Sequence, residues 1–205
     1  MDLIFLLAAY LIGSIPSSVW LGKIFYNKDV RNEGSGNAGA TNTIRVLGWQ
    51  IGVVVLLLDA LKGWVTVYLL SLFSYESVWG LSTSIFQISL AFMAVLGHIF
   101  PIYVGFKGGK GVATLLGVAI AIFPWQVILI ELSIFAVIFI SSRIVSLGSI
   151  VVAISLPVLM YFFFPVDTAI LILGMVIAVF IPVTHHKNIS RLLKGEETRL
   201  DFHKS

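Results

Sequence analysis

Long apolar runs alternate with short polar segments along this chain of 205 residues. A helix needs about 20 apolar residues to cross the hydrocarbon core of a bilayer, and most of the runs approach that length. The fourth run is short and meets the fifth at Pro124, where we expect a turn or kink, so it could instead be half of a broken or re-entrant element. The pattern predicts seven membrane-spanning helices, at residues 3–23, 51–72, 84–104, 112–123, 126–141, 147–164 and 167–184.

The basic residues orient these helices. Seven crossings place residues 24–50, 105–111, 142–146 and the tail from 185 on one side of the membrane. Of the 13 Lys and Arg residues, twelve fall on that side, with Lys23 at the adjoining end of the first run, and Lys62 is the exception. By the positive-inside rule this side is cytoplasmic, which predicts an N-terminus outside and a C-terminus in the cytoplasm.

Composition agrees with a membrane protein and narrows the chemistry. Hydrophobic residues make up 59% of the chain and charged residues 11%, which leaves no room for a soluble domain. The first run lacks a basic leader and a clear cleavage site, so we expect it to be retained. The chain has no cysteines, which excludes disulfides, thiolate metal ligands and a cysteine nucleophile. We therefore expect one all-α membrane domain over residues 1–205, with glycine-rich cytosolic loops.

Three charged residues lie in the interior of the predicted helices, away from their ends. Asp59 and Lys62 stand three residues apart in the second run, so they could neutralise one another across one helical turn. Intramembrane charges usually face a bundle interior, and a structural pair is as consistent with this pattern as a catalytic one. Glu131, in the fifth run, has no local partner and receives no role.

The longest polar interruption, RNEGSGNAGATNTIRVLG at residues 31–48, is dense in small and hydrogen-bonding residues. Gly34, Gly36 and Gly39 form a GxGxxG pattern, but no hydrophobic strand precedes it, which excludes a dinucleotide fingerprint. Such glycines still allow a ligand to approach backbone amides closely. A flexible interfacial turn is the alternative. Polar groups suited to a phosphate come from Ser35, Asn37, Thr41, Asn42, Thr43 and Arg45.

A second glycine loop follows the third run, in LGHIFPIYVGFKGGKGVAT. Gly108, Gly109 and Gly111 flank Lys110 just before the fourth run, which favours an anion near the free amides of a helix N-terminus. The spacing differs from that of a P-loop and no Ser or Thr follows Lys110, so nucleotide hydrolysis is not indicated. Upstream, His98 could simply hydrogen-bond a backbone carbonyl.

Two further segments on the same side carry polar residues. Arg143 and Ser149 flank the start of the sixth run, which is a weak signal by itself. In the tail, His185 and Asn188 are three residues apart and would share one face of a continuing helix. The charges that follow, Glu197 among them, could equally form a solvated amphipathic tail, the default for such runs.

Metal and cofactor chemistry lacks its usual signatures. The chain has no HExxH, no zinc-ligand spacing, no GxSxG elbow and no carboxylate cluster for paired Mg²⁺ ions. We therefore predict no metal and no cofactor. Cations at Arg45, Lys110 and Arg143 beside glycine loops match ligands that carry phosphate, and two phosphates fit better than one.

Three stretches together resemble a known family. RNEGSGNAGATNTIRVLG, GHIFPIYVGFKGGKGVAT and HHKNISRLLKGEE, in that order and spacing, look like the three motifs of the bacterial acyl-phosphate:glycerol-3-phosphate acyltransferases, the PlsY family. The resemblance covers essentially the whole chain. One departure is His186, where an Arg is expected; it leaves the spacing of His185 and Asn188 unchanged.

The resemblance implies a seven-helix enzyme of the bacterial inner membrane whose active site faces the cytoplasm. It implies transfer of a fatty acyl group from acyl phosphate to the 1-hydroxyl of sn-glycerol 3-phosphate, the first step of bacterial phospholipid biosynthesis. The products would be lysophosphatidic acid and phosphate, and no acyl-CoA, acyl carrier protein or nucleic acid is implied as a partner. Carried over residue by residue, the functional positions are Ser35, Arg45, the second-loop glycines with Lys110, His185 and Asn188.

Physical reasoning gives these residues roles as hypotheses. Arg45 and Lys110 would hold the phosphate of glycerol 3-phosphate. Ser35, His185 and Asn188 would orient the attacking hydroxyl, with His185 or the leaving phosphate as the base. Gly36, Asn37, Thr41 and Ser149 would cradle the acyl phosphate. The other substrate-binding candidates are Gly34, Gly39, Gly108, Gly109, Gly111 and Arg143.

The competing hypothesis is a small membrane carrier for phosphorylated metabolites, because interrupted helices and cationic loops also bind transported anions. The polar groups gather on one face rather than at the midplane of two inverted halves, which disfavours a carrier. A non-catalytic scaffold is weaker still, because it would not need four polar, glycine-bearing segments.

Overall fold

The computed structural model describes residues 2–73 and 80–200, with only the backbone described for residues 70–73. Within these ranges the chain is helical and contains no strand, which confirms the all-α prediction. The chain forms two compact units, the first ending at Ile122 and the second beginning at Phe123.

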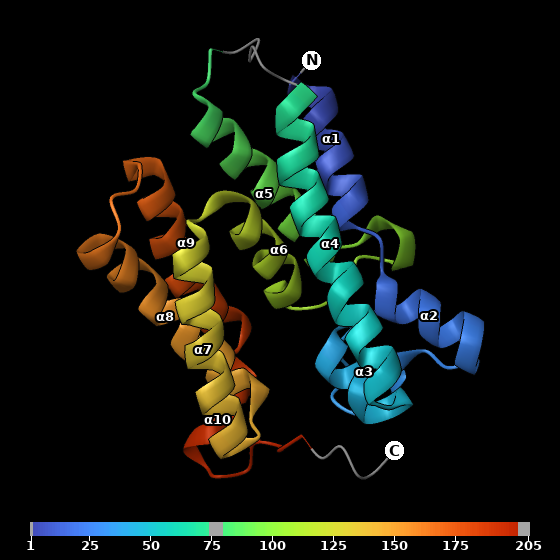
Figure 1. Ribbon diagram of the computed structural model, residues 1–205. Coiled ribbons are helices and arrows are strands. Elements are labelled where there is room, and N and C mark those ends of the chain that lie inside the picture. Colours follow the sequence, from blue (N-terminus) through green and yellow to red (C-terminus); the bar gives the residue numbers. More distant parts are fainter. Residues whose placement is uncertain (1, 74–79, 201–205) are drawn as a thin grey trace. The chain divides into compact units, whose positions relative to one another are not determined.

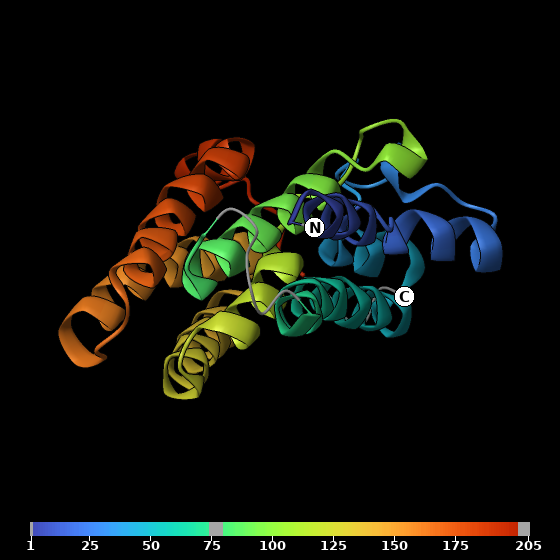
Figure 2. The same ribbon diagram turned by 90° about the horizontal axis from the view of Figure 1, so that it is seen from above.

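The first unit holds the helices up to Ile122. Its most extensive helix contacts are those of α4 with α6 and of α1 with α5, which Figure 1 and Figure 2 show from two directions. A hydrophobic core formed by Ala9, Val67, Phe86, Leu90 and Val118 joins these four helices. The elements are α1 (Asp2–Gly13), α2 (Ser17–Tyr26), η1 (Val30–Asn32), α3 (Ala40–Leu47), α4 (Trp49–Phe73), α5 (Thr83–Ile99), η2 (Ile102–Val104) and α6 (Val112–Ile122).

The first apolar run is broken, whereas the sequence predicts one helix over residues 3–23. Helix α1 ends at Gly13 and α2 begins at Ser17, with a bend of 40° between them. Pro16 accounts for the break, because proline has no backbone N–H to continue the helix and disfavours helical backbone in the residue before it. Apolar residues continue on both sides of the break, so the bent pair together still has the length and composition of a candidate span.

A buried ion pair attaches this break to α4. The Nζ atom of Lys62 lies 2.8 Å from Oδ1 of Asp59, so the prediction that the two side chains pair is confirmed. The same ammonium donates to the carbonyl oxygen of Ile15 at 2.8 Å, and Ser17 Oγ donates to Asp59 Oδ1 at 3.0 Å. The charges are thus compensated inside the protein, as intramembrane charges require.

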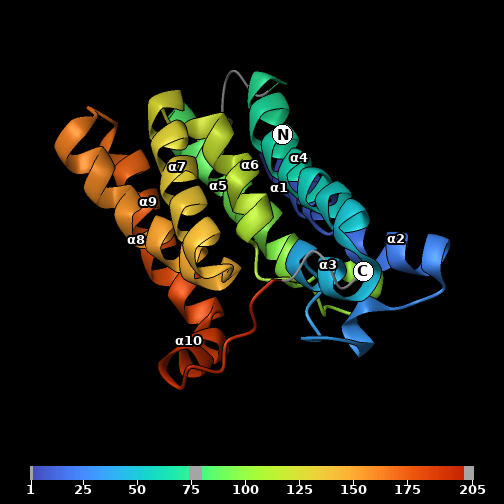
Figure 3. The same ribbon diagram turned by 60° about the horizontal axis from the view of Figure 1, so that its bottom comes forward.

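The second unit consists of α7 (Trp125–Ser142), α8 (Val145–Phe163), α9 (Thr168–Thr184) and α10 (His186–Leu193). Helix α7 begins directly after Pro124, in agreement with the predicted turn. Helix α8 packs against both α7 and α9 (Figure 1). Glu131 on α7, without a local partner, accepts a hydrogen bond from Ser155 Oγ on α8 at 2.8 Å. Helix α10 is bent by 65° from α9. Figure 3 shows α10 at the end of α9.

Each of the seven predicted runs contains a helix, but the third, predicted for residues 84–104, ends its α-helix at Ile99 and is followed by the short η2. The lengths of the helices do not give seven clear spans. Among the described residues, four helices are long and apolar enough to cross a membrane, or six if the bent pairs α1–α2 and α9–α10 each count as one. Helix α6 has 11 residues. That corresponds to about 16 Å, against about 30 Å for a hydrocarbon core. The seventh crossing stays a prediction.

Candidate active site

The first glycine loop is shorter than predicted. The sequence predicts loop throughout residues 31–48, but Ala40–Leu47 form α3. This helix starts after Gly39, which supplies no capping side chain, so the first amides of α3 are left uncapped. Uncapped amides at a helix N-terminus attract anions. Thr41 lies in the first turn of α3 and Arg45 in its last.

Asn42 holds the first loop in shape. Its side chain is buried, and its Nδ2 donates to the carbonyl oxygens of Val30 at 2.7 Å and Glu33 at 3.2 Å. Its Oδ1 accepts from the backbone N–H of Ser35 at 2.7 Å. The sequence suggests Asn42 as a polar group for a ligand, whereas the structure uses its whole amide inside the loop. The exposed Ser35 therefore sits on a fixed backbone.

Gly34 is required by this arrangement. Its φ of +62° lies in the left-handed region, and a Cβ there would collide with Oδ1 of Asn42. Any larger residue would displace the amide that fixes Ser35. The substrate-binding roles of Gly34, Gly36, Asn37 and Gly39 stay predictions.

The second glycine loop closes the C-terminal end of α5. The backbone N–H of Gly108 donates to the Ile99 carbonyl at 3.0 Å, and that of Gly109 donates to the His98 carbonyl at 3.2 Å. These two amides satisfy carbonyls that a helix end leaves open. They are therefore not the free amides that the sequence suggests for an anion at this loop.

Gly109 also brings the two loops of the first unit together. A Cβ on Gly109 would collide with Nε2 of His98 and would lie 3.0 Å from the carbonyl oxygen of Ala38 in the first loop. His98 is buried, with Nδ1 3.9 Å from Oδ1 of Asp59. The loop that carries the half-buried Lys110 thus rests on the same buried polar residues that hold the break in the first helix.

His185 stands at the bend between α9 and α10 and is buried. Its Nδ1 lies 2.9 Å from the carbonyl oxygen of Ile181. A carbonyl only accepts, so in the neutral ring Nδ1 carries the proton and Nε2 keeps the lone pair that a general base uses. The bend also shows that His185 and Asn188 do not lie in one continuing helix, because α10 begins at His186.

Glu197 gathers three donors in the second unit. Its Oε1 accepts from Asn188 Nδ2 at 2.5 Å and from Ser146 Oγ at 2.8 Å, and its Oε2 accepts from Arg191 Nε at 2.6 Å. Burial raises the pKa of this carboxyl, but the hydrogen bonds from these three partners outweigh it, and the pKa lies below its usual range. For Glu197 the alternative of a solvated tail is therefore wrong. Because Nδ2 faces the carboxylate, Asn188 presents its Oδ1 acceptor on the other side of the amide.

Arg143 and Ser149 lie at the start of α8. Arg143 is exposed and ends α7 in the left-handed conformation, with φ of 58°, and its carbonyl accepts from the Leu200 N–H at 2.8 Å. Ser149 is buried, and its Oγ donates to the Val145 carbonyl at 3.0 Å. The hydroxyl proton of Ser149 thus serves its own helix, and a ligand would meet only its oxygen. Both binding roles stay predictions.

Sequence reasoning missed the structural parts played by Asn42 and Glu197. A signal existed for each, because Asn42 follows Gly39 within the first motif and Glu197 lies within the third. Over residues 2–73 and 80–200, no three His, Asp or Glu side chains are placed to hold a metal ion.

Comparisons with known proteins identify the class of protein. Residues 3–195 match the sequence model described as glycerol-3-phosphate acyltransferase. The glycerol-3-phosphate acyltransferase of Fusobacterium nucleatum is 44% identical over 97% of this chain and 97% of its own length. That of Listeria monocytogenes is 42% identical over 96% of this chain and 95% of its own length.

Solved structures agree with the sequence matches. PlsY, an integral membrane glycerol 3-phosphate acyltransferase solved in its glycerol 3-phosphate form, aligns with a TM-score of 0.84 at 39% identity, over 98% of this chain and 96% of that one. Its lysophosphatidic acid form aligns with a TM-score of 0.81 at 37% identity over the same shares. The fold and these matches define an integral membrane acyltransferase. The chain belongs to the glycerol-3-phosphate acyltransferase family, as the resemblance of its three motifs predicts.

Proposed function

We propose that this protein transfers a fatty acyl group from acyl phosphate to the 1-hydroxyl of sn-glycerol 3-phosphate, giving lysophosphatidic acid and phosphate. This is the first step of bacterial phospholipid biosynthesis. The similarity over 98% of the chain to PlsY in glycerol 3-phosphate and lysophosphatidic acid forms carries the proposal, because these molecules are a substrate and a product of such a transfer. The choice of acyl phosphate as donor, with neither acyl-CoA nor acyl carrier protein, rests on the resemblance of the motifs.

The chemistry needs alignment and charge stabilisation rather than a covalent acyl-enzyme. The hydroxyl oxygen attacks the acyl carbonyl carbon, the bond from that carbon to the phosphate oxygen breaks, and phosphate leaves with the electron pair. The hydroxyl proton passes to Nε2 of His185 or to the leaving phosphate. Because acyl phosphate is already an activated mixed anhydride, holding the two reactants in line supplies most of the catalysis. The bond from Nδ1 of His185 to Ile181 supports the base role.

In this proposal the predicted site residues have separate tasks. In the first unit, Arg45 and Lys110 hold the phosphate of glycerol 3-phosphate, and Ser35 orients its hydroxyl. In the second unit, His185 and Asn188 act on the hydroxyl. The acyl phosphate is bound by Gly36, Asn37, Thr41 and Ser149. The uncapped amides of α3 support the placement of Thr41 in this role.

The proposed topology has seven spans in the bacterial inner membrane, with the N-terminus outside and the active site facing the cytoplasm. The gathering of every Lys and Arg except Lys62 on one side supports it. Residues 1–205 form one catalytic domain in this proposal.

The topology has a direct test, because the chain has no cysteine of its own. Single cysteines at Pro165 and Ser141, both exposed, are labelled in intact spheroplasts with a maleimide that cannot cross membranes. We expect Pro165→Cys to react at once and Ser141→Cys only after permeabilisation. The reverse result would contradict this topology, either because α6 does not cross or because the N-terminus lies inside.

The activity is tested with protein purified in lipid. Acyl phosphate and glycerol 3-phosphate together should release phosphate and form lysophosphatidic acid, and neither should do so alone. Acyl-CoA or acyl carrier protein in place of acyl phosphate should give no product. If folded protein releases no phosphate with both substrates, the proposal is wrong.

The base role is tested at His185, with its exposed neighbour His186 as the matched control. We expect His185→Ala to lower kcat by about 100-fold or more, the usual contribution of general acid–base catalysis, with little change in KM. His186→Ala should keep wild-type turnover. Unchanged turnover in His185→Ala would remove this residue from the mechanism.

A further inference from the structure

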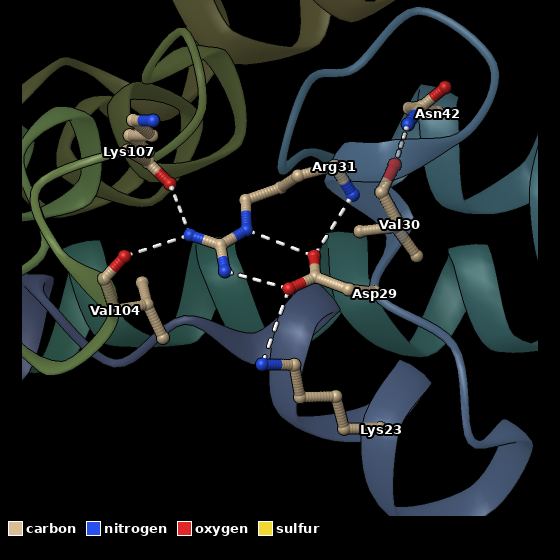
Figure 4. Close-up of polar contacts among 7 residues, drawn as sticks. All are labelled: Lys23, Asp29, Val30, Arg31, Asn42, Val104 and Lys107. Carbon is tan, nitrogen blue, oxygen red and sulfur yellow. Dashed lines mark hydrogen bonds and ion pairs between the residues drawn. The ribbon is translucent and has the colours of Figure 1, made fainter.

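Arg31 lies between the two glycine loops of the first unit and has no role in the reaction described above. Figure 4 shows its guanidinium between the carboxylate of Asp29 and the carbonyl oxygens of Val104 and Lys107. These carbonyls are 73 and 76 residues away along the chain. The side chain of Lys107 points away from the guanidinium, so the second loop contributes its backbone alone.

The guanidinium makes four hydrogen bonds through its side-chain nitrogens. Nε donates to Asp29 Oδ1 at 2.9 Å and Nη2 donates to Oδ2 at 2.7 Å, which is a bidentate pair. Nη1 donates to the Val104 carbonyl at 2.8 Å and to the Lys107 carbonyl at 3.4 Å. A lysine ammonium has no planar fork and cannot reproduce the carboxylate pair and the carbonyl bonds together. We call this arrangement the Asp29–Arg31 bridge.

Asp29 is itself held in place. It accepts from the backbone N–H of Arg31 at 3.1 Å and lies 3.3 Å from Nζ of Lys23. The hydrogen bond from the Arg31 side chain holds the pKa of Asp29 well below its usual range, and Asp29 in turn raises the pKa of Arg31. The two side chains are 13% and 19% exposed, so solvent and salt screen them less than a surface pair.

At both ends the bridge residues are close to candidate site residues, through hydrogen bonds on one side and along the chain on the other. Next to Arg31, the carbonyl of Val30 accepts from Asn42, which also fixes the backbone of Ser35. At the other end, Lys107 precedes Lys110 by three residues. Beneath the bridge, the side chain of Val104 packs against a small cluster formed by Val19, Val30 and Ala38.

We propose that Arg31, oriented by Asp29, is a positioning residue that sets the spacing between the two glycine loops. Gly109 against Ala38 is one point of attachment between the loops, and the bridge is a second. Two attachments fix a relative orientation that one would leave free to rotate. The catalytic consequence rests on the proposed function, in which Arg45 from α3, directly after the first loop, and Lys110 from the second loop hold one phosphate.

The kinetic test compares Arg31→Lys and Asp29→Asn with Lys28→Gln, which removes an exposed ion pair with Glu33 in the same segment. Arg31→Lys keeps the charge and loses the fork, and we expect the KM for glycerol 3-phosphate to rise about tenfold. The KM for acyl phosphate should change less than about twofold, because three of its four proposed ligands lie within the first loop and α3. Lys28→Gln should match the wild type.

Asp29→Asn keeps an uncharged acceptor for the guanidinium, so its effect should have the same direction and be smaller. The double variant should be no worse than Arg31→Lys alone, because the two residues act as one unit. Equal KM values for glycerol 3-phosphate in Arg31→Lys and wild type would overturn the proposal, as would fully additive losses.

A second measurement reads the loop spacing without enzyme activity. Nitroxide labels are attached to cysteines placed at Asn32 and Phe106, both exposed, and their distance distribution is measured by dipolar EPR. Arg31→Lys should shift or broaden the distribution, and Lys28→Gln should not. An unchanged distribution in folded Arg31→Lys protein would rule out the bridge as a spacer. If wild-type protein proves inactive with the proposed substrates, the proposed function fails while this measurement still decides the bridge.

Discussion

Asp59 in the first unit and Glu197 in the second are both buried carboxylates that collect donors from distant segments, but their surroundings differ. Asp59 pairs with Lys62 and accepts from Ser17, all within the membrane-spanning helices. Glu197 accepts from Ser146, in the first turn of α8, and from Asn188 and Arg191 in the tail helix α10. In the hydrocarbon region no water can replace a lost partner, whereas near the surface it can.

The comparison teaches that the same arrangement has two uses. The Asp59–Lys62 pair joins α4 to the break between α1 and α2, so it maintains the fold. Glu197 fixes the amide of Asn188, so it mainly orients a candidate catalytic group. Changes at the Asp59–Lys62 pair should therefore affect mainly the unfolding free energy, whereas changes at Glu197 should also affect turnover.

The largest effect is expected from Lys62→Met, which leaves the carboxylate of Asp59 without its cation inside the membrane. Removing one partner of a buried pair typically costs about 3–5 kcal/mol of unfolding free energy. Denaturation in mild detergent measures it. The double variant Asp59→Asn with Lys62→Met should recover part of the loss, because no lone charge remains. A single variant as stable as the wild type would show that the pair does not hold the break.

Glu197→Gln should have a smaller effect on stability, of about 1–3 kcal/mol, because it weakens charged hydrogen bonds without leaving an unpaired anion. The folded pKa of Glu197 lies below the ordinary value of 4.5, so the carboxylate stabilises the fold above that pH and loses this contribution as the pH falls through the folded pKa. The difference in unfolding free energy between variant and wild type should have its full value at neutral pH and should shrink as the pH falls below 4.5.

The same variant should lose turnover at neutral pH, because Asn188 is no longer held by a carboxylate. Glu196→Gln, the same change at the exposed neighbouring residue, serves as a control. If the stability difference stays constant through the acid range, or turnover is unaffected, the carboxylate of Glu197 does not orient Asn188.

Glu131→Gln is expected to have the smallest effect. Glu131 bonds to Ser155 alone, and its other oxygen has no hydrogen-bond partner among the residues that the structure describes. Gln keeps an oxygen for that hydroxyl and nearly the same volume, so stability should change by less than about 1.5 kcal/mol and turnover little. A large loss of turnover would show that this intramembrane carboxylate takes part in the reaction.

The sequence predicts the Asp59–Lys62 pair and misses Glu197 for a physical reason. Two opposite charges three residues apart in an apolar run are unusual in themselves, and helix geometry alone brings them together. The partners of Glu197 lie 51, 9 and 6 residues away, and a charged tail has an ordinary solvated alternative. The local sequence pattern therefore cannot distinguish a solvated Glu197 from a buried one.

The same limit explains the other differences. Hydropathy locates all seven helical runs, because apolar length alone decides them, yet composition continues unchanged through the break at Pro16. Helix α3 is only eight residues long and lies inside a polar stretch, so no apolar run marks it. Motif spacing supplies the candidate site residues, but Arg31 depends on carbonyls more than 70 residues away.

The break in the first span bears on how the protein enters the membrane. A ribosome makes Ile15 and Ser17 first and Lys62 47 residues after Ile15. Synthesis runs from the N-terminus, so the acceptor and donor groups of the broken helix are already in place when α4 leaves the translocon. Asp59 and Lys62 would be costly to insert alone, but their partners Ser17 and Ile15 are synthesised before them. The order of these residues along the chain thus favours insertion of the charged helix.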